Sequence, residues 1–150
     1  MGAPPDLTLH YFWVAPTVRP PYHNEFTILI GPGPQGNISY LPDYPNHNPP
    51  RWLEPLSITL DDLETLYALL VDKDAFRATW HVASPRPIGG EQAWIEVTAG
   101  DQHASIPSGL NPRDAAAARH IFDAVRALVP QPVWDRLESQ RQEYIQNYSK

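Results

Sequence analysis

Proline is the residue that most limits how this chain can fold. The sequence holds 18 prolines among 150 residues, or 12%, which is more than twice the usual share of about 5%. Because proline has no amide hydrogen and a fixed φ, it is excluded from helix interiors and from central strands. Helices and strands must therefore fit into the intervals between prolines, and the connections between them are expected to be stiff.

The composition is otherwise that of a folded domain. Leu, Ile, Val and Phe together make up 35 of the 150 residues, above the share of about 20% below which disorder is expected. A chain of this length fits one domain, which buries roughly 70% of its unfolded surface. Proline and glycine together account for 26 residues, fewer than the roughly 25–30% found in low-complexity chains. We therefore expect a single domain over residues 1–150.

Three strands are predicted before the first helix. Residues 7–14, LTLHYFWV, are β-branched and aromatic, with apolar groups at both odd and even positions. That pattern is typical of a strand covered on both faces. Residues 26–30, FTILI, place their apolar groups on one face, and residues 37–41, NISYL, follow after a turn at 31–36. These last two segments are predicted to form a hairpin.

The clearest helix signal begins at Thr59. Thr59 and Asp62 have the spacing of a capping box, in which the threonine oxygen accepts an early amide hydrogen and the carboxylate reaches back. Apolar residues then follow at the i, i+3, i+4, i+7 spacing of a buried helix face. They are Leu63, Leu66, Tyr67 and Leu70. The helix is expected to end at the sequence Asp-Lys-Asp over residues 72–74.

Two or three more strands are predicted after this helix. In residues 76–82, FRATWHV, apolar and polar side chains alternate, which indicates a half-buried strand. Residues 93–98, AWIEVT, and residues 102–106 flank the turn sequence at 99–101. Such a pair is predicted to form a second hairpin.

Two helices are predicted at the end of the chain. Asn111 followed by Pro112 is a typical helix start, with a capping residue before a proline in the first turn. Pro130 ends this helix, and Pro132 can begin another that extends to about Asn147. The last region, residues 130–150, is also a candidate docking or interface helix.

The predicted element order is β-β-β-α-β-β-β-α-α. It indicates the α+β class, with an antiparallel sheet of about five or six strands built from hairpins and with helices packed on one face.

No catalytic motif is found. Residues 31–36, GPGPQG, match G-x-G-x-x-G, but two of the six residues are prolines without an amide hydrogen to offer a phosphate, and no helix can begin behind them. A rigid hairpin turn is the better interpretation. The chain has no cysteine, which excludes disulfides and thiolate chemistry. No catalytic residue is assigned, and a protein that is not an enzyme is favoured.

The histidines offer an alternative of another class. His10, His81 and His103 fall in predicted strands, so two of them could meet across the sheet and form a small catalytic or metal-binding site. The chain has no H-E-x-x-H sequence and no calcium loop. A lone strand histidine is more often a half-buried polar residue, so no metal and no cofactor is assigned.

The charge and hydropathy of the sequence limit the kinds of partner that the protein is expected to bind. Residues 1–75 carry three basic and nine acidic side chains, and the whole chain has a net charge of −6. This acidic excess argues against nucleic acid as a partner, because a nucleic-acid-binding protein is expected to show a basic stripe. No apolar run approaches the ~18 residues of a membrane span. The first ten residues lack the basic and apolar regions of a secretory signal, so a cytoplasmic location is predicted.

The remaining signal is the mixing of proline with aromatic residues, most densely in residues 41–52, LPDYPNHNPPRW. Stiff loops that carry aromatic side chains make good contact surfaces, because they offer a large area at a small entropic cost. The predicted binding residues are Tyr22, His23, Tyr40, Tyr44, His47, Arg51 and Trp52. The alternative is that these aromatic side chains fold back onto the sheet.

The favoured hypothesis is therefore a non-catalytic module that binds a protein or peptide through the loops near residues 15–25 and 41–55. A second alternative, beside the histidine site, is a structural subunit that docks through Trp134, Tyr144 and Tyr148, and a homo-oligomer is one form that this alternative takes. The element order and the segment 127–145, ALVPQPVWDRLESQRQEYI, resemble in organisation the emfourin type of metallopeptidase inhibitor. This resemblance implies an inhibitory or accessory role and assigns no residue.

Overall fold

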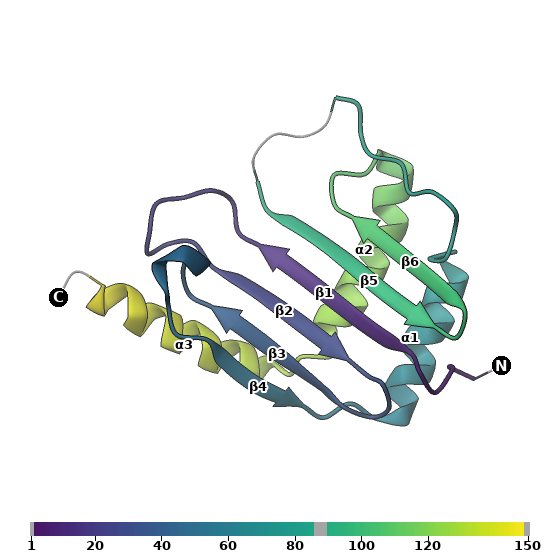
Figure 1. Cartoon of the computed structure of the whole chain (residues 1–150), viewed down its shortest axis with the longest axis horizontal. Coiled ribbons are helices and arrows are strands. Elements are labelled where there is room, and N and C mark those ends of the chain that lie inside the picture. The colour runs from purple at the N-terminus through teal and green to yellow at the C-terminus, as the bar shows by residue number, and fades with distance from the viewer. Residues whose placement is uncertain (1, 86–89, 149–150) are drawn as a thin grey trace.

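The computed structural model describes residues 2–85 and 90–148. In this part of the chain, six strands form one antiparallel sheet with the spatial order β4-β3-β2-β1-β5-β6 (Figure 1). The strands are β1 (Thr8–Val14), β2 (Glu25–Ile30), β3 (Gly36–Leu41), β4 (Trp52–Leu56), β5 (Gln92–Ala99) and β6 (Gln102–Pro107). Strands β1 to β4 form a meander, and β1 joins this meander to the β5–β6 hairpin.

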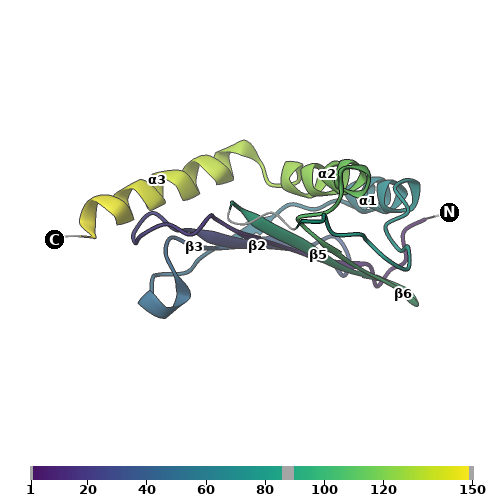
Figure 2. The same ribbon diagram turned by 90° about the horizontal axis from the view of Figure 1, so that it is seen from above.

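The helices of the described chain all lie on the same face of the sheet, as Figure 2 shows. They are α1 (Leu60–Asp72), α2 (Pro112–Ala127) and α3 (Gln131–Asn147). The short 3-10 turn η1 (Pro45–His47) projects on the opposite side of the sheet. The predicted α+β class, with helices on one face of an antiparallel sheet, is confirmed.

The hydrophobic core fills the space between the sheet and the helices. Alternate strand residues point into it, and several of them, including Leu9, Ile28 and Ile95, are completely buried. From the helices, Leu70 of α1 and Ile121 of α2 are equally buried. A strand side chain covered in this way is stabilised by about 1.5–3 kcal/mol relative to an exposed one.

The predicted capped starts of the first two helices are confirmed. At the start of α1, the Asp62 amide donates to Thr59 Oγ1 over 3.0 Å, and the Thr59 amide donates to Asp62 Oδ2 over 2.9 Å. At the start of α2, the Asp114 amide donates to Asn111 Oδ1 over 2.9 Å. These side chains satisfy amide groups that have no partner within the first turn of a helix.

The glycine-rich turn between β2 and β3 is confirmed as a hairpin turn. The Gly31 amide donates to the Gln35 carbonyl over 2.8 Å. Gly31 has a φ of +76°, and a Cβ atom at this position would lie 2.1 Å from the Leu7 carbonyl oxygen. Glycine is therefore required here both by the left-handed backbone and by the close approach of the chain before β1.

The strand predicted over residues 76–82 is wrong. This segment is irregular, and only Val82 forms an isolated bridge, to Leu110. Arg77 folds back over the end of α1 and donates to the Lys73 and Asp74 carbonyl oxygens, while its guanidinium lies 3.7 Å from the centre of the Trp80 ring. The alternating pattern thus arises from a helix-terminating turn that buries Trp80, and among the described residues the Val82 bridge is its only strand-like pairing.

A strand that the sequence did not predict takes its place in the sheet. β4 pairs with β3 at the edge of the sheet and contains Pro55. Proline is tolerated there because an edge strand has one side without hydrogen-bonding partners. The proline-rich segment 41–55 therefore ends in regular structure and is not a loop throughout.

Candidate binding surface on the uncovered face of the sheet

The face of the sheet opposite the helices is open over most of its area (Figure 2). Phe12 of β1 and Trp94 of β5 are half-buried on this face and are direct partners in the strand register. Their rings stack at a centroid distance of 5.0 Å and an interplanar angle of 15°. The expectation that residues 7–14 are covered on both faces is therefore wrong, because a helix layer covers only one of them.

A shallow hollow of about 280 Å³ lies beside this aromatic pair. Thr27 of β2 and Ser39 of β3 face each other across the strand register within it. Pro45 of η1 and Arg51 stand at its border, and Arg51 donates to Ser39 Oγ over 2.7 Å. The full lining is Phe12, Trp13, Val14, Glu25, Phe26, Thr27, Ser39, Leu41, Pro45, Arg51 and Trp94.

The wall of this hollow is braced by contacts between two proline-containing loops. The ring of Tyr44 stacks on the ring of His23 with centroids 3.8 Å apart and an interplanar angle of 6°. The Tyr44 hydroxyl also accepts a hydrogen bond from the Val18 amide over 3.1 Å and donates to the Val18 carbonyl. Tyr44 thus fastens the loop before η1 to the loop between β1 and β2, so this part of segment 41–52 is not a slack linker.

Buried polar groups support the corner formed by these two loops. His23 has an exposed fraction of 2%, and its Nε2 lies 2.7 Å from Glu25 Oε2. Asp43 is completely buried, and its carboxylate accepts the Tyr44 amide over 2.7 Å and the Tyr144 hydroxyl over 2.9 Å. Such bonds are required, because a buried polar group without a partner is costly.

The contact with Tyr144 ties the corner to α3. Burial, together with the nearby Asp43 carboxylate, raises the pKa of Tyr144 to about 12. Arg141, one turn earlier on α3, donates from Nη2 to the Tyr22 carbonyl over 3.0 Å. The second half of α3 therefore acts as a brace for the loops rather than as an independent arm.

The structure separates the predicted binding residues into three groups, and His23 and Tyr44 are the stacked pair described above. Tyr40 is 4% exposed and stacks on Trp52 at 5.8 Å, on the helix-facing side of the sheet. The positions of these two rings agree with the alternative interpretation, in which aromatic side chains fold back onto the sheet. Tyr22 is 43% exposed, and His47 and Arg51 are also exposed, so these three remain available for contact.

The predicted interface residues of α3 are divided in the same way. Trp134 packs edge-on against Phe26 with centroids 5.1 Å apart. Tyr144 is engaged by Asp43, as described above. Tyr148 is 42% exposed. The aromatic side of α3 is therefore directed mainly toward its own sheet.

The histidines proposed for a catalytic or metal site are not brought together. His10 lies on β1 and His103 on β6, with β5 between them, and His81 lies outside the strands. His103 Nε2 lies 3.3 Å from Glu96 Oε2. Within residues 2–85 and 90–148, no group of three histidine, aspartate or glutamate side chains is placed to hold a metal ion.

Phe12 and Trp94 are the surface residues that sequence reasoning missed. A usable signal was present in residues 7–14, where apolar side chains occupy both faces of one strand. If helices cover only one face of an antiparallel sheet, the second apolar set must lie on the open face. The two predictions together would have placed Phe12 there.

Comparison with protein-family models and with curated proteins finds no match to this sequence. In the described part of the chain, no helix has the length and apolar character needed to cross a bilayer.

Proposed function

We propose that this protein is a non-catalytic binding module that holds an extended peptide or protein segment on the open face of its sheet. The partner lies across β1, β2 and β5, against the wall formed by η1. The observation that carries the proposal is the stacked pair of Phe12 and Trp94, which remains half-exposed next to a hollow of about 280 Å³.

The chemistry of this face fits peptide recognition. An aromatic pair offers a flat apolar platform for a partner side chain, and aromatic residues are enriched among the residues that dominate binding energy. Thr27 and Ser39 supply hydroxyl groups beside this platform, and Arg51 supplies a charged donor. The arrangement combines an apolar centre with a polar border, as protein interfaces do.

The stiffness of the wall supports the same proposal. Tyr44, His23 and Asp43 hold the turn in place through stacking and hydrogen bonds within the chain. A loop that is already ordered loses little conformational entropy when a partner binds, which increases affinity. The proline-rich loops thus contribute mainly by shaping the hollow, and they also carry the exposed side chains of Tyr22 and His47.

The experiment is selection from a displayed library of random dodecapeptides against the immobilised protein, followed by affinity measurement with synthetic peptides. The test variant is Phe12→Thr with Trp94→Thr, because threonine keeps the strand preference while removing both rings. The matched control is Val71→Thr, which changes a 55% exposed apolar side chain on α1, on the other side of the sheet.

We expect selected peptides to bind the wild-type and Val71→Thr proteins equally, and to bind the double variant at least about tenfold more weakly. Circular dichroism and thermal unfolding check that the double variant is folded. Failure to select any binding peptide, or equal affinity for the double variant, would contradict the proposal.

A further inference from the structure

A second hollow lies on the helix-covered side of the sheet, between α2 and the strands β1 and β5. Its volume is about 510 Å³, within the range of roughly 300–1,000 Å³ that is typical of small-molecule sites. The facing surfaces carry small side chains, with Ala93 on β5 and Ala115 and Ala118 on α2. Since protein interiors are normally close-packed, these alanines leave room for an apolar ligand beside Phe122, which also lines the hollow.

Arg126 brings a positive charge to the lining of this hollow. Its Nη1 lies 3.4 Å from Tyr11 Oη, and its guanidinium carbon lies 5.2 Å from the Phe26 ring and 5.3 Å from the Trp134 ring. The ion pairs formed among the described residues do not include Arg126. Partial burial of a cation without a carboxylate partner costs free energy. An anion that enters the hollow would therefore be stabilised by a charge-assisted contact with Arg126.

The Tyr11 hydroxyl is a second group that can bind an anion. Tyr11 is 2% exposed, and burial raises the pKa of its hydroxyl, although Arg126 acts in the opposite direction. The hydroxyl therefore stays protonated at neutral pH. It accepts from Arg126, and its own proton can be donated to a ligand oxygen.

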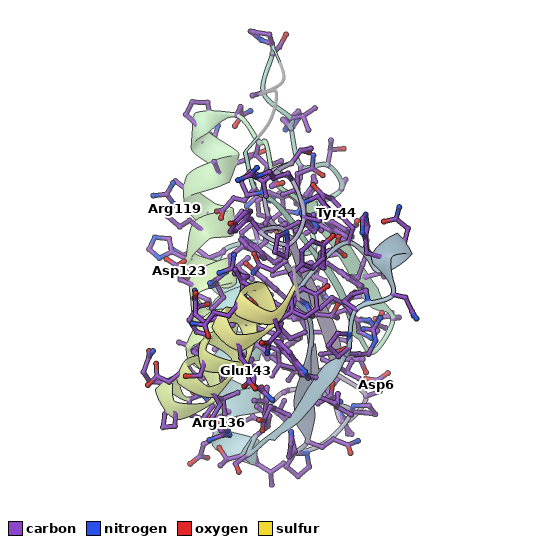
Figure 3. The ribbon with its side chains drawn as sticks, turned by 90° about the vertical axis from the view of Figure 1, so that its left-hand side faces the viewer. Asp6, Tyr44, Arg119, Asp123, Arg136 and Glu143 are labelled. Carbon is purple, nitrogen blue, oxygen red and sulfur yellow. The ribbon has the colours of Figure 1, made fainter. Side chains whose placement is uncertain are left out.

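Two acidic side chains set a limit on the charge of the ligand. Glu91 and Asp123 line the same hollow, and the charges of both raise the pKa of Tyr11. Their charges therefore act at the place where the anion would bind. Asp123 lies one turn beyond Arg119 on α2, as Figure 3 shows, and both side chains are exposed. A second negative charge on the ligand would be repelled by Glu91 and Asp123.

We propose that this hollow binds a small monocarboxylate with an apolar or aromatic body. The carboxylate contacts the Arg126 guanidinium and the Tyr11 hydroxyl, and the body lies against Phe122 and the alanines. This site is separate from the proposed peptide surface, because the sheet lies between them. Figure 3 shows Tyr44 well apart from Arg119 and Asp123 of α2.

The test is isothermal titration of the purified protein with 3-phenylpropionate. The uncharged analogue 3-phenylpropanamide and the dicarboxylate phenylsuccinate serve as comparison probes. We expect saturable binding of 3-phenylpropionate, and binding of both other probes at least about tenfold more weakly. No saturable binding at millimolar concentrations, or equal affinity for the amide, would overturn the proposal.

Single substitutions test whether the assigned residues bind the ligand. Arg126→Gln removes the charge, and Tyr11→Phe removes only the hydroxyl while keeping the buried ring. Each is expected to weaken 3-phenylpropionate binding about tenfold. The control is Arg113→Gln, which removes an exposed arginine from the first turn of α2, outside the hollow. Unchanged affinity in both Arg126→Gln and Tyr11→Phe, or an equal loss in Arg113→Gln, would refute the assigned site.

Discussion

The rings of His23 and Tyr44 lie flat against each other with centroids 3.8 Å apart, although the two residues belong to different loops. The Tyr44 hydroxyl adds two hydrogen bonds to the backbone of Val18. This contact converts two proline-rich connections into one braced corner at the border of the open sheet face.

Loss of the Tyr44 hydroxyl should weaken this corner. We expect Tyr44→Phe to lower the free energy of unfolding by about 1–3 kcal/mol, because two hydrogen bonds of about 0.5–1.5 kcal/mol each are lost. Tyr44→Ala should cost more, because the stack on His23 is also lost. Urea unfolding measures both values. Tyr22→Phe, which changes an exposed tyrosine of the same corner, is the control, and an equal loss in that control would contradict the expectation.

Gly31 and Gly33 offer a matched pair of backbone tests. Both have positive φ angles, of +76° and +79°, but only at Gly31 would a Cβ atom collide with backbone, at 2.1 Å from the Leu7 carbonyl oxygen. Gly33→Ala should cost about 1–2 kcal/mol from its left-handed backbone alone. Gly31→Ala should cost clearly more, because the chain before β1 must also move. Denaturant midpoints compare them, and equal midpoints would mean that the close approach is not rigid.

Acid stability should depend on Asp114. A hydrogen bond from the His81 backbone amide, at 2.7 Å, is the main reason that the pKa of this carboxyl lies below its ordinary value; burial opposes the shift. A lowered pKa in the folded state means that the stabilisation is present above the unfolded value of about 3.9 and is lost as pH falls through the folded value.

The variant that tests this effect is Asp114→Asn. Compared with the wild type, it should be less stable at neutral pH and should lose less of its stability on acidification. Urea unfolding at neutral pH and at about pH 3 measures the difference. Parallel losses in the two proteins would show that other carboxyl groups control acid unfolding.

The sequence predicted helix starts and turns correctly where the interactions that decide them are local. The capping box at Thr59 and the start at Asn111 depend on residues three positions apart, and both occur as predicted. The turn after Gly31 likewise depends on its own glycines and prolines. The strand prediction for residues 76–82 failed because Trp80 is buried by a turn that contacts the end of α1. Alternation of apolar and polar residues alone does not distinguish such a turn from a strand.

The candidate site could be predicted only in part. The sequence pointed to the proline-rich loops, and Tyr44 and Arg51 do stand beside the hollow. It did not identify which rings stay exposed, because that depends on strand pairing between distant segments. Tyr40 is buried and Trp52 is half-buried on the helix-facing side, whereas Phe12 meets Trp94 on the open face, 82 positions away in the chain.

The most direct test of the peptide-binding proposal is a backbone and side-chain NMR titration of the wild-type protein with a selected peptide. We predict that the largest chemical-shift changes occur at the Trp94 indole, at Phe12 and at Thr27, while the α2 residues around Arg126 change little. Shifts centred on α3, or a uniformly small response over the open face despite saturable binding, would contradict it.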